Sequence, residues 1–469
     1  MTTAADLGAF AADVTFEGLP PAVVDATKRR LLDTAGAAFA ADDSALLDGV
    51  SATTDVAGGD ACTRWASDGA RAGPASAAAD TAATVRASGH ADAYLAPGGP
   101  SYPSDAIPAV VAAAEHADAD GETLLTAVAA AYEVHGELAW HVPVREHGLG
   151  PATHSALSAA AGAAVALELD AAEAEHAVAL AAADHTSLAV DDGHQPVASA
   201  NAAAAGVTSA LLAANGIEGP TDVFEAHPAL HDLTVESDPD PEATAGDAEV
   251  DAEEGAACEF DGEAAHDHDD GFALEATCER VHDAVSTRYA GMLAAQPAIS
   301  AAIDLVQRVD IDPADVTSVS LQTFDPLTLE TPRTDLPDAS DAAGRSLPYA
   351  LAVALADQSF GPEHLDGGRL EDPEVRRLAE SVTVEEEPSL TAQFDAGLMP
   401  AVLAVELVDG DVHHTTVGAY PGHPTQPMDW ETLEAKVAAL VGEERAATLR
   451  AACEDVDDAA VGDFLAALA

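Results

Sequence analysis

The first half of the chain carries apolar residues at the three- and four-residue spacing of α-helices almost without interruption. The stretch "PPAVVDATKRRLLDTAGAAFA" opens with proline, which favours the first turn of a helix, and places Val23 and Leu31 at helical spacing. Similar patterns fill residues 118–140, 155–170 and 171–190. Because Ala and Gly dominate the apolar faces, the helices can approach closely, and we expect a packed helical domain over residues 1–235.

The pattern breaks at residues 236–272, where no helical or strand period can be found. Fifteen acidic residues and no basic one lie between Glu236 and Asp270. Such a segment cannot bury enough apolar surface to offset its ordering entropy, so we interpret it as an acidic, disordered insertion. "HDHDD" within it could bind a divalent cation weakly, but a solvated loop is the favoured interpretation, and no metal site is predicted.

Strand-like alternation appears after the insertion. "VTSVSLQTF" from Val316 alternates, and so does "AVLAVELVDGDVHHTTV" from Ala401, which has a hairpin turn at Asp409 and Gly410. Helical patterns lie between and around these strands, at residues 296–309, 347–360 and 372–382. We expect an α+β lid domain at 273–405 and a strand and helical segment at 406–469 that returns to the helical domain. The predicted fold class is therefore mostly α with an α+β part.

Composition adds one inference, which concerns the salt concentration of the solvent around the protein. Eighteen Lys and Arg residues against 83 Asp and Glu give a formal net charge of -65, which is typical of a halophilic surface hydrated in molar salt. Nucleic acid and anionic membrane are excluded as favourable partners. The start lacks a signal-peptide pattern and no long uninterrupted apolar run follows, so a cytoplasmic, soluble protein is expected. Four scattered cysteines indicate neither disulfides nor a zinc site.

Several stretches, in the same order along the chain, make this sequence resemble the MmgE/PrpD family, which includes 2-methylcitrate dehydratase and cis-aconitate decarboxylase. Besides "FEGLPPAVVDATKRRLLDTAGAAFA", they include "YPSDAIPAVVAAAEHADADGETLLTAVAAAYEV", "QPAISAAIDL", "RSLPYALAVALADQSF" and "YPGHPTQPMDWETLEAKVAAL". The resemblance implies a helical domain built from both chain ends, an inserted α+β lid, a homodimer, a small carboxylate substrate and no organic cofactor.

The same resemblance supplies the candidate site residues. Asp92 and Tyr349 match family positions, the latter within an intact "SLPYA" motif, and are assigned catalytic roles. His154 and His194 lie near segments that line the family's site and are further catalytic candidates that could take over from the lost residues. The resemblance implies substrate binding by five residues of the same segments, namely His90, Tyr102, Gln195, Arg288 and Arg345. Arginines have few uses on a halophilic surface, which adds weight to the last two.

The chain also departs from the family motifs. Tyr102 replaces the His of an H-P-S motif, Gln195 stands at the family's Lys, and Gln296 stands at a polar lid position. A positioned base and cationic groups are needed to remove a proton next to a carboxylate, and losing one such group costs about 10²- to 10⁴-fold in rate. Two hypotheses follow: a lyase with an altered, eroded catalytic set, or an inactive paralogue that binds a small molecule or an active homologue.

Overall fold

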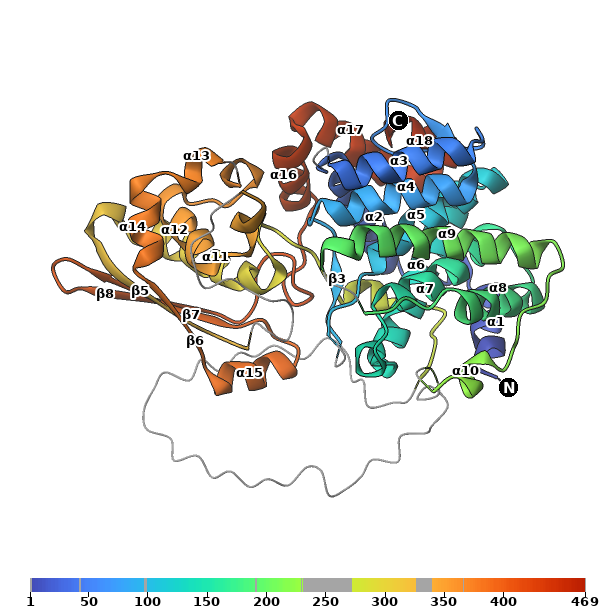
Figure 1. Ribbon diagram of the computed structural model, residues 1–469, viewed down its shortest axis with the longest axis horizontal. Coiled ribbons are helices and arrows are strands. Elements are labelled where there is room, and N and C mark those ends of the chain that lie inside the picture. The colour runs from blue at the N-terminus through green and yellow to red at the C-terminus, as the bar shows by residue number, and fades with distance from the viewer. Residues whose placement is uncertain are drawn as a thin grey trace, which may run out of the picture.

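The computed structural model describes residues 2–41, 44–96, 99–189, 192–228, 230, 272–325, 340–365 and 367–468. It shows two domains side by side, a larger helical one and a smaller one built around a sheet (Figure 1). The predicted fold class, mostly α with an α+β part, is confirmed. The acidic insertion predicted at 236–272, with its "HDHDD" motif, lies outside the described residues except for Phe272.

The helical domain combines both ends of the chain. Its helices, some of them joined by short strands or 3₁₀ turns, are α1 (Thr3–Asp13), α2 (Pro21–Phe39), α3 (Ala45–Ala57), α4 (Pro74–Ala87), α5 (Ile107–Ala117), α6 (Gly121–His141), α7 (Ala152–Ala166), α8 (Ala171–Asp184), α9 (Gln195–Ala214), α10 (Val223–Ala226), α16 (Trp430–Val441), α17 (Glu443–Glu454) and α18 (Val461–Leu468). Start signals are local: α2 has Pro21 in its first turn, and Asp170 forms a capping box with Glu173 at α8.

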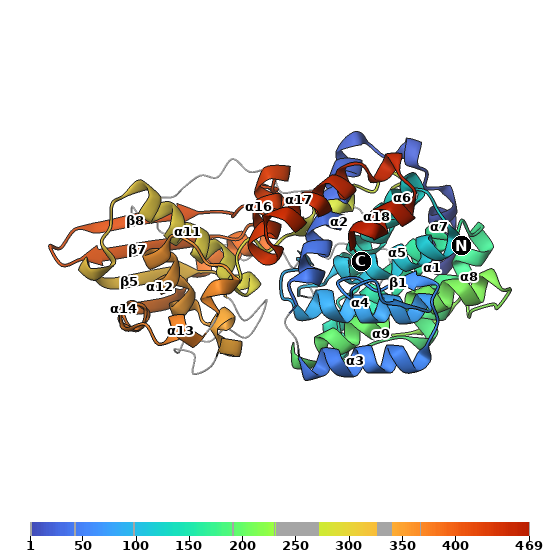
Figure 2. The same cartoon turned by 90° about the horizontal axis from the view of Figure 1, so that it is seen from above.

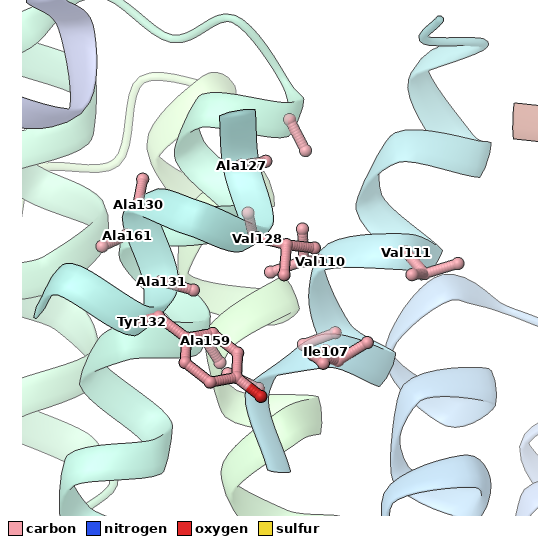
Figure 3. Packing of buried hydrophobic residues seen from close by; sticks show 14 of the residues in the cluster. Ile107, Val110, Val111, Ala127, Val128, Ala130, Ala131, Tyr132, Ala159 and Ala161 are labelled. Atoms are coloured by element: carbon pink, nitrogen blue, oxygen red, sulfur yellow. The ribbon is translucent and has the colours of Figure 1, made fainter. Parts of the chain in front are cut away.

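Small side chains allow the central helices to pack closely. Figure 3 shows the contact among α5, α6 and α7, where alanines fill most of the interface around Val110 and Val128. A Cβ atom on Gly162 would lie 2.6 Å from Val110 Cγ2, and one on Gly206 would lie 2.4 Å from Ala159 Cβ. The predicted alanine- and glycine-mediated packing is therefore present, and it leaves no room for larger residues at these contacts.

Helix α9 shows how apolar this domain is. Among the described helices it alone combines the length and composition of a membrane span. Most of it is buried, however, and it packs against α4, α7 and α8. In this position α9 is a core helix of the helical domain.

The second domain is a four-stranded sheet covered by helices. Its strands are β5 (Val316–Thr323), β6 (Val382–Glu386), β7 (Ala401–Leu407) and β8 (Val412–Val417), in the order β6-β5-β7-β8, with only β5 and β6 parallel. Packed with the sheet are α11 (Gln296–Arg308), α12 (Leu347–Asp357), α14 (Pro373–Glu380) and α15 (Pro388–Asp395), and the short helix α13 (Gly367–Leu370) lies against α14. Its core has larger side chains, including Phe324, Tyr349 and Phe360.

Two sequence-based boundaries need correction. The predicted division at 405/406 falls inside β7, and β8 belongs to the same sheet, so the second domain continues to Val417. The predicted helix at 372–382 ends at Glu380, and Val382 begins β6. Strand β6 pairs with β5 through its backbone while its side chains stay largely exposed, so its sequence carries no buried alternation.

The last helices close the helical domain against its first ones. Figure 2 shows α16 and α17 running back along α2 after the chain leaves the sheet, and α18 packs against α17 and α5. Two salt bridges stabilise this contact. Lys28 Nζ lies 2.7 Å from Asp457 Oδ1, and Lys436 Nζ pairs with the carboxylate of Asp33. These are the only lysines in the sequence.

Candidate active site and interdomain cleft

Asp92 is held in a buried network at the start of the 3₁₀ turn η2 (Pro103–Ala106). Its Oδ1 accepts the backbone N–H of Ser104 at 3.1 Å, and its Oδ2 accepts the hydroxyl of Tyr132 at 2.7 Å. Arg30 Nη1 lies 3.7 Å from the same carboxylate. Burial raises the pKa of Asp92, while Arg30 and the two hydrogen bonds oppose that rise. Asp92 is thus enclosed by donors of its own domain.

A second buried carboxylate, Asp105 of η2, joins three helices to this turn. It accepts hydrogen bonds from Arg86 of α4, at 2.8 Å from Nη2, and from Ser199 of α9, at 2.7 Å, and a longer one from Ser155 of α7. The Arg86 guanidinium also lies 3.6 Å from the ring centre of Tyr102. Tyr102 is therefore stacked on a cation, and its backbone carbonyl accepts from Ser155.

His154 belongs to a directed chain of hydrogen bonds. Its Nε2 faces the carbonyl of Val142 at 3.0 Å and must carry the proton, so its Nδ1 accepts from the hydroxyl of Ser101 at 3.1 Å. Ser101 in turn accepts from Nε2 of His135 at 2.7 Å. Burial lowers the pKa of His154 to about 4, and burial also lowers the pKa of His135 well below its ordinary value. Both imidazoles are neutral at pH 7, and the Nδ1 lone pair of His154 is already occupied.

The segment from His90 to Ser101 connects the two domains. Strand β3 (Ala93–Tyr94) pairs with β4 (Ala284–Val285), and Ala93 belongs to the core of the second domain while Ala91 belongs to that of the first. Tyr102 also packs against the second core. This turn-rich stretch, which bears the predicted residues, is therefore part of the domain boundary.

The predicted residues of the second domain lie inside or at the edge of its core. Tyr349 is 1% exposed, and its hydroxyl donates to the backbone carbonyl of His364. Arg345 ends the 3₁₀ turn that precedes α12 and is half-buried. A tyrosine hydroxyl committed to a carbonyl in this way stabilises the domain from within.

Gln296 and Arg288 form one unit beside the cleft. The Gln296 side chain is fully buried; its Oε1 accepts the backbone N–H of Arg288 at 2.8 Å and that of Tyr289 at 2.9 Å. Its Nε2 donates to the carbonyls of Tyr289 and Gly291. This amide therefore holds the loop before α11, and its four hydrogen bonds leave it none for a ligand.

Two predicted residues lie at the start of α9. His194 is exposed, and Gln195 is the half-buried first residue of the helix. Thus Asp92, Tyr102 and His154 meet around η2, His194 and Gln195 begin a neighbouring helix, and Tyr349 lies in the other core.

A cleft of about 710 Å³ lies between the domains. Its walls come from α11, β8, α16 and the segment at His90. Of the predicted residues, His90 and Arg288 line it, and Lys436 lies beside them. Burial and Lys436 lower the pKa of His90 to about 4. No ion pair to Arg288 is present in the described parts of the chain, and its guanidinium lies 5.8 Å from the Tyr289 ring centre.

Several residues important to these networks were missed from the sequence, among them Arg86, Asp105 and His135. Arg30 and Tyr132 surround Asp92, and Lys436 donates to the backbone carbonyl of His90 at 2.9 Å. Lys436 had a signal, since it is one of two lysines and lies in an otherwise apolar helical pattern. Among the described residues, no group of three His, Cys, Asp or Glu side chains could hold a metal ion.

Comparison with protein families agrees with this architecture. Residues 5–242 match the MmgE/PrpD N-terminal domain, and residues 289–458 match the MmgE/PrpD C-terminal domain. The two matches together cover most of the chain, and they confirm the resemblance inferred from the motifs. A search of curated proteins found no match.

Proposed function

Since the chain belongs to the MmgE/PrpD family, a family of dehydratase-like lyases, we propose that it binds a small carboxylate in the interdomain cleft and has lost the family's proton-transfer set. The main support for this proposal is the position of Arg288. This residue lines the cleft without a carboxylate partner among the described residues, in a chain with a net charge of -65. An arginine in that setting favours a carboxylate ligand, because its planar fork matches the two oxygens.

The arrangement of the predicted catalytic residues supports binding over elimination. Asp92 and His154 are buried and hydrogen-bonded within the helical domain, and Tyr349 donates inside the second core. General acid and base catalysis needs such groups within hydrogen-bonding reach of one reacting centre. These three point to different partners, so the eroded catalytic set remains our interpretation for this chain.

Titration calorimetry tests the proposal with full-length protein in molar KCl. Citrate, 2-methylcitrate and cis-aconitate are each titrated, and we expect saturable binding of at least one. Arg288→Gln should weaken that binding about tenfold or more, the loss of one charge-assisted contact. Arg376→Gln is the matched control, since Arg376 also belongs to the second domain but donates to the carbonyl of Leu370. Equal binding by both variants would contradict the proposal.

A lyase remains the second candidate because of His90. Its imidazole lines the same cleft, is neutral at pH 7 and could accept a proton from the carbon next to a carboxylate that is held at Arg288. Ultraviolet absorbance of the conjugated double bond would report turnover of the three compounds. Turnover that is lost in His90→Gln would favour this candidate; binding without turnover favours the first. The homodimer implied by the family is also a proposal, to be measured by light scattering.

A further inference from the structure

A second, smaller hollow lies where the chain crosses between the domains. It has a volume of about 80 Å³ and is lined by α2, by the crossing at Ala284 and Ser286, and by the return crossing at 422–428. The two crossings touch: Ser286 donates its backbone N–H to the carbonyl of Gly422 at 2.8 Å. Gly422 has a φ of +121°, and a Cβ there would lie 2.3 Å from the Ser286 carbonyl oxygen. The hollow therefore has a tightly packed wall.

Basic side chains gather around this hollow. Arg29, Arg30 and His282 line it, in a chain with only 18 Lys and Arg among 469 residues. Arg30 donates to the carbonyls of Val281 and Ala284 and to the hydroxyl of Ser286. Its nearest carboxylate is Asp92 at 3.7 Å, a group whose pKa is raised by burial. Neutral oxygens thus satisfy most of the Arg30 donors, while His282 lies 3.6 Å from Glu279.

Arg29 supplies an N–H donor, at its Nε, that has no acceptor among the described residues. Its Nη1 donates to the carbonyl of Met428 at 2.6 Å, and its Nη2 lies 2.9 Å from the half-exposed Asp25. Its Nε is buried and has no partner among the described residues. A buried N–H left unpaired is unfavourable, and an acceptor in the hollow would satisfy it. The Ser286 hydroxyl, which accepts from Arg30, keeps its own hydrogen to donate.

We propose that the hollow binds a small inorganic oxyanion of the size of phosphate, held by Arg29 Nε and the Ser286 hydroxyl, with His282 at its edge. His423 shapes the wall only, because its Nδ1 accepts from the backbone and hydroxyl of Thr425. Water is the competing occupant, since a hollow of this volume can hold several molecules. An anion differs from water in adding charge attraction to the two arginines.

The location gives the bound anion a structural effect. It would connect both crossings to α2, at Arg29 and Arg30, and so restrict movement of one domain against the other. Ser286 is two residues before Arg288, so the same anion would stiffen the segment that carries the cleft arginine. This inference does not depend on the identity, or the existence, of a ligand in the cleft.

Sodium phosphate titrated into the full-length protein in molar KCl tests the proposal, with the midpoint of thermal unfolding and calorimetry as readouts. We expect a saturable rise in the midpoint, as for any ligand that binds only the folded state. Arg29→Lys keeps a cation near Asp25 but removes the Nε donor, and should weaken phosphate binding at least about tenfold. Ser286→Ala should weaken it as well.

Two controls separate this site from others. Arg450→Lys changes an arginine that pairs with Glu434 and Glu454 on the C-terminal helices, and should leave phosphate binding unchanged. Arg288→Gln should also leave it unchanged, which distinguishes the hollow from the cleft. Circular dichroism confirms that each variant is folded. The proposal is overturned by a midpoint that follows ionic strength alone with added KCl, by the absence of saturable binding, or by equal binding in Arg29→Lys.

Discussion

The two domains bury polar side chains in different ways. In the helical domain, ion pairs and hydrogen bonds lie deep between helices, as with Lys436 and Asp33 or Arg86 and Asp105. The second domain surrounds its sheet with larger apolar side chains, and Phe324 stacks on Phe394 at 4.4 Å between ring centres. An alanine buries far less apolar area than a leucine or phenylalanine. The helical domain therefore depends more on close backbone contact and on satisfied polar networks.

This difference explains why residues typical of an active site have structural partners here. Asp92, Asp105 and His154 each connect two or more helices of an alanine-rich core. A buried polar group is tolerated only when its partners are present, and removing one partner is strongly destabilising. Polar residues in such a core fix which helices meet.

The largest expected effect comes from filling a close helix contact. Gly206→Val should destabilise the protein by at least about 4 kcal/mol, because its Cβ would meet Ala159 Cβ at 2.4 Å and the backbone there cannot move aside. Gly410→Val, at the β7–β8 turn with φ +90° and open space around it, should cost about 2 kcal/mol from backbone strain. Denaturant unfolding followed by circular dichroism measures both. Equal losses would remove the contrast between the domains.

Lowering the pH should have the next largest effect on stability, because buried neutral histidines resist protonation. His154 has a folded pKa of about 4 against an ordinary value of 6.5, so the unfolded chain binds more protons between these values. Stability is thus full above about pH 6.5 and declines as pH falls to 4, by about 3 kcal/mol for this residue. His90 and His423 act in the same direction.

The measurement is unfolding free energy at several pH values for the native protein and two variants. His154→Gln should lose stability at pH 7 but show a smaller decline toward pH 4. His194→Gln, at an exposed position, should keep the decline of the native protein. An unchanged slope in His154→Gln would show that the imidazole is not buried as a neutral group.

The smallest expected losses of stability come from removing two tyrosine hydroxyls. Tyr132→Phe deprives the buried Asp92 of its 2.7 Å donor and should cost about 2 kcal/mol. Tyr349→Phe removes a bond to a backbone carbonyl and should cost about 1 kcal/mol, with no change in carboxylate binding at the cleft. Stability and calorimetry on both variants decide this. A loss of ligand binding in Tyr349→Phe would return that hydroxyl to a functional role.

Local patterns predicted the elements well where one rule dominated. The Asp409–Gly410 turn and its flanking strands appear as predicted, because hairpin chemistry and alternation agree there. Strand β6 was missed because its side chains are mostly exposed. The family motifs located the segments that meet at η2, including those of Asp92 and His154.

Side-chain roles could not be predicted in the same way. The partner of Asp92 is Tyr132, 40 residues away, and that of Tyr349 is a carbonyl of the loop at His364. A sequence motif gives the residue type at a position, but it does not show which groups form hydrogen bonds with that side chain. Gln296 illustrates this, since a residue at a family polar position binds only its own loop.

The pairing of α2 with the end of the chain constrains how the protein is made. Gly36 accommodates Val437, Asp33 pairs with Lys436, and Lys28 with Asp457, so an early helix is completed by residues more than 400 positions later. The ribosome must synthesise nearly the whole polypeptide before the partners of α2 are available. The sheet domain, contiguous from α11 to β8, can mature first on the nascent chain, while the helical bundle waits with apolar surface that chaperones would need to shield.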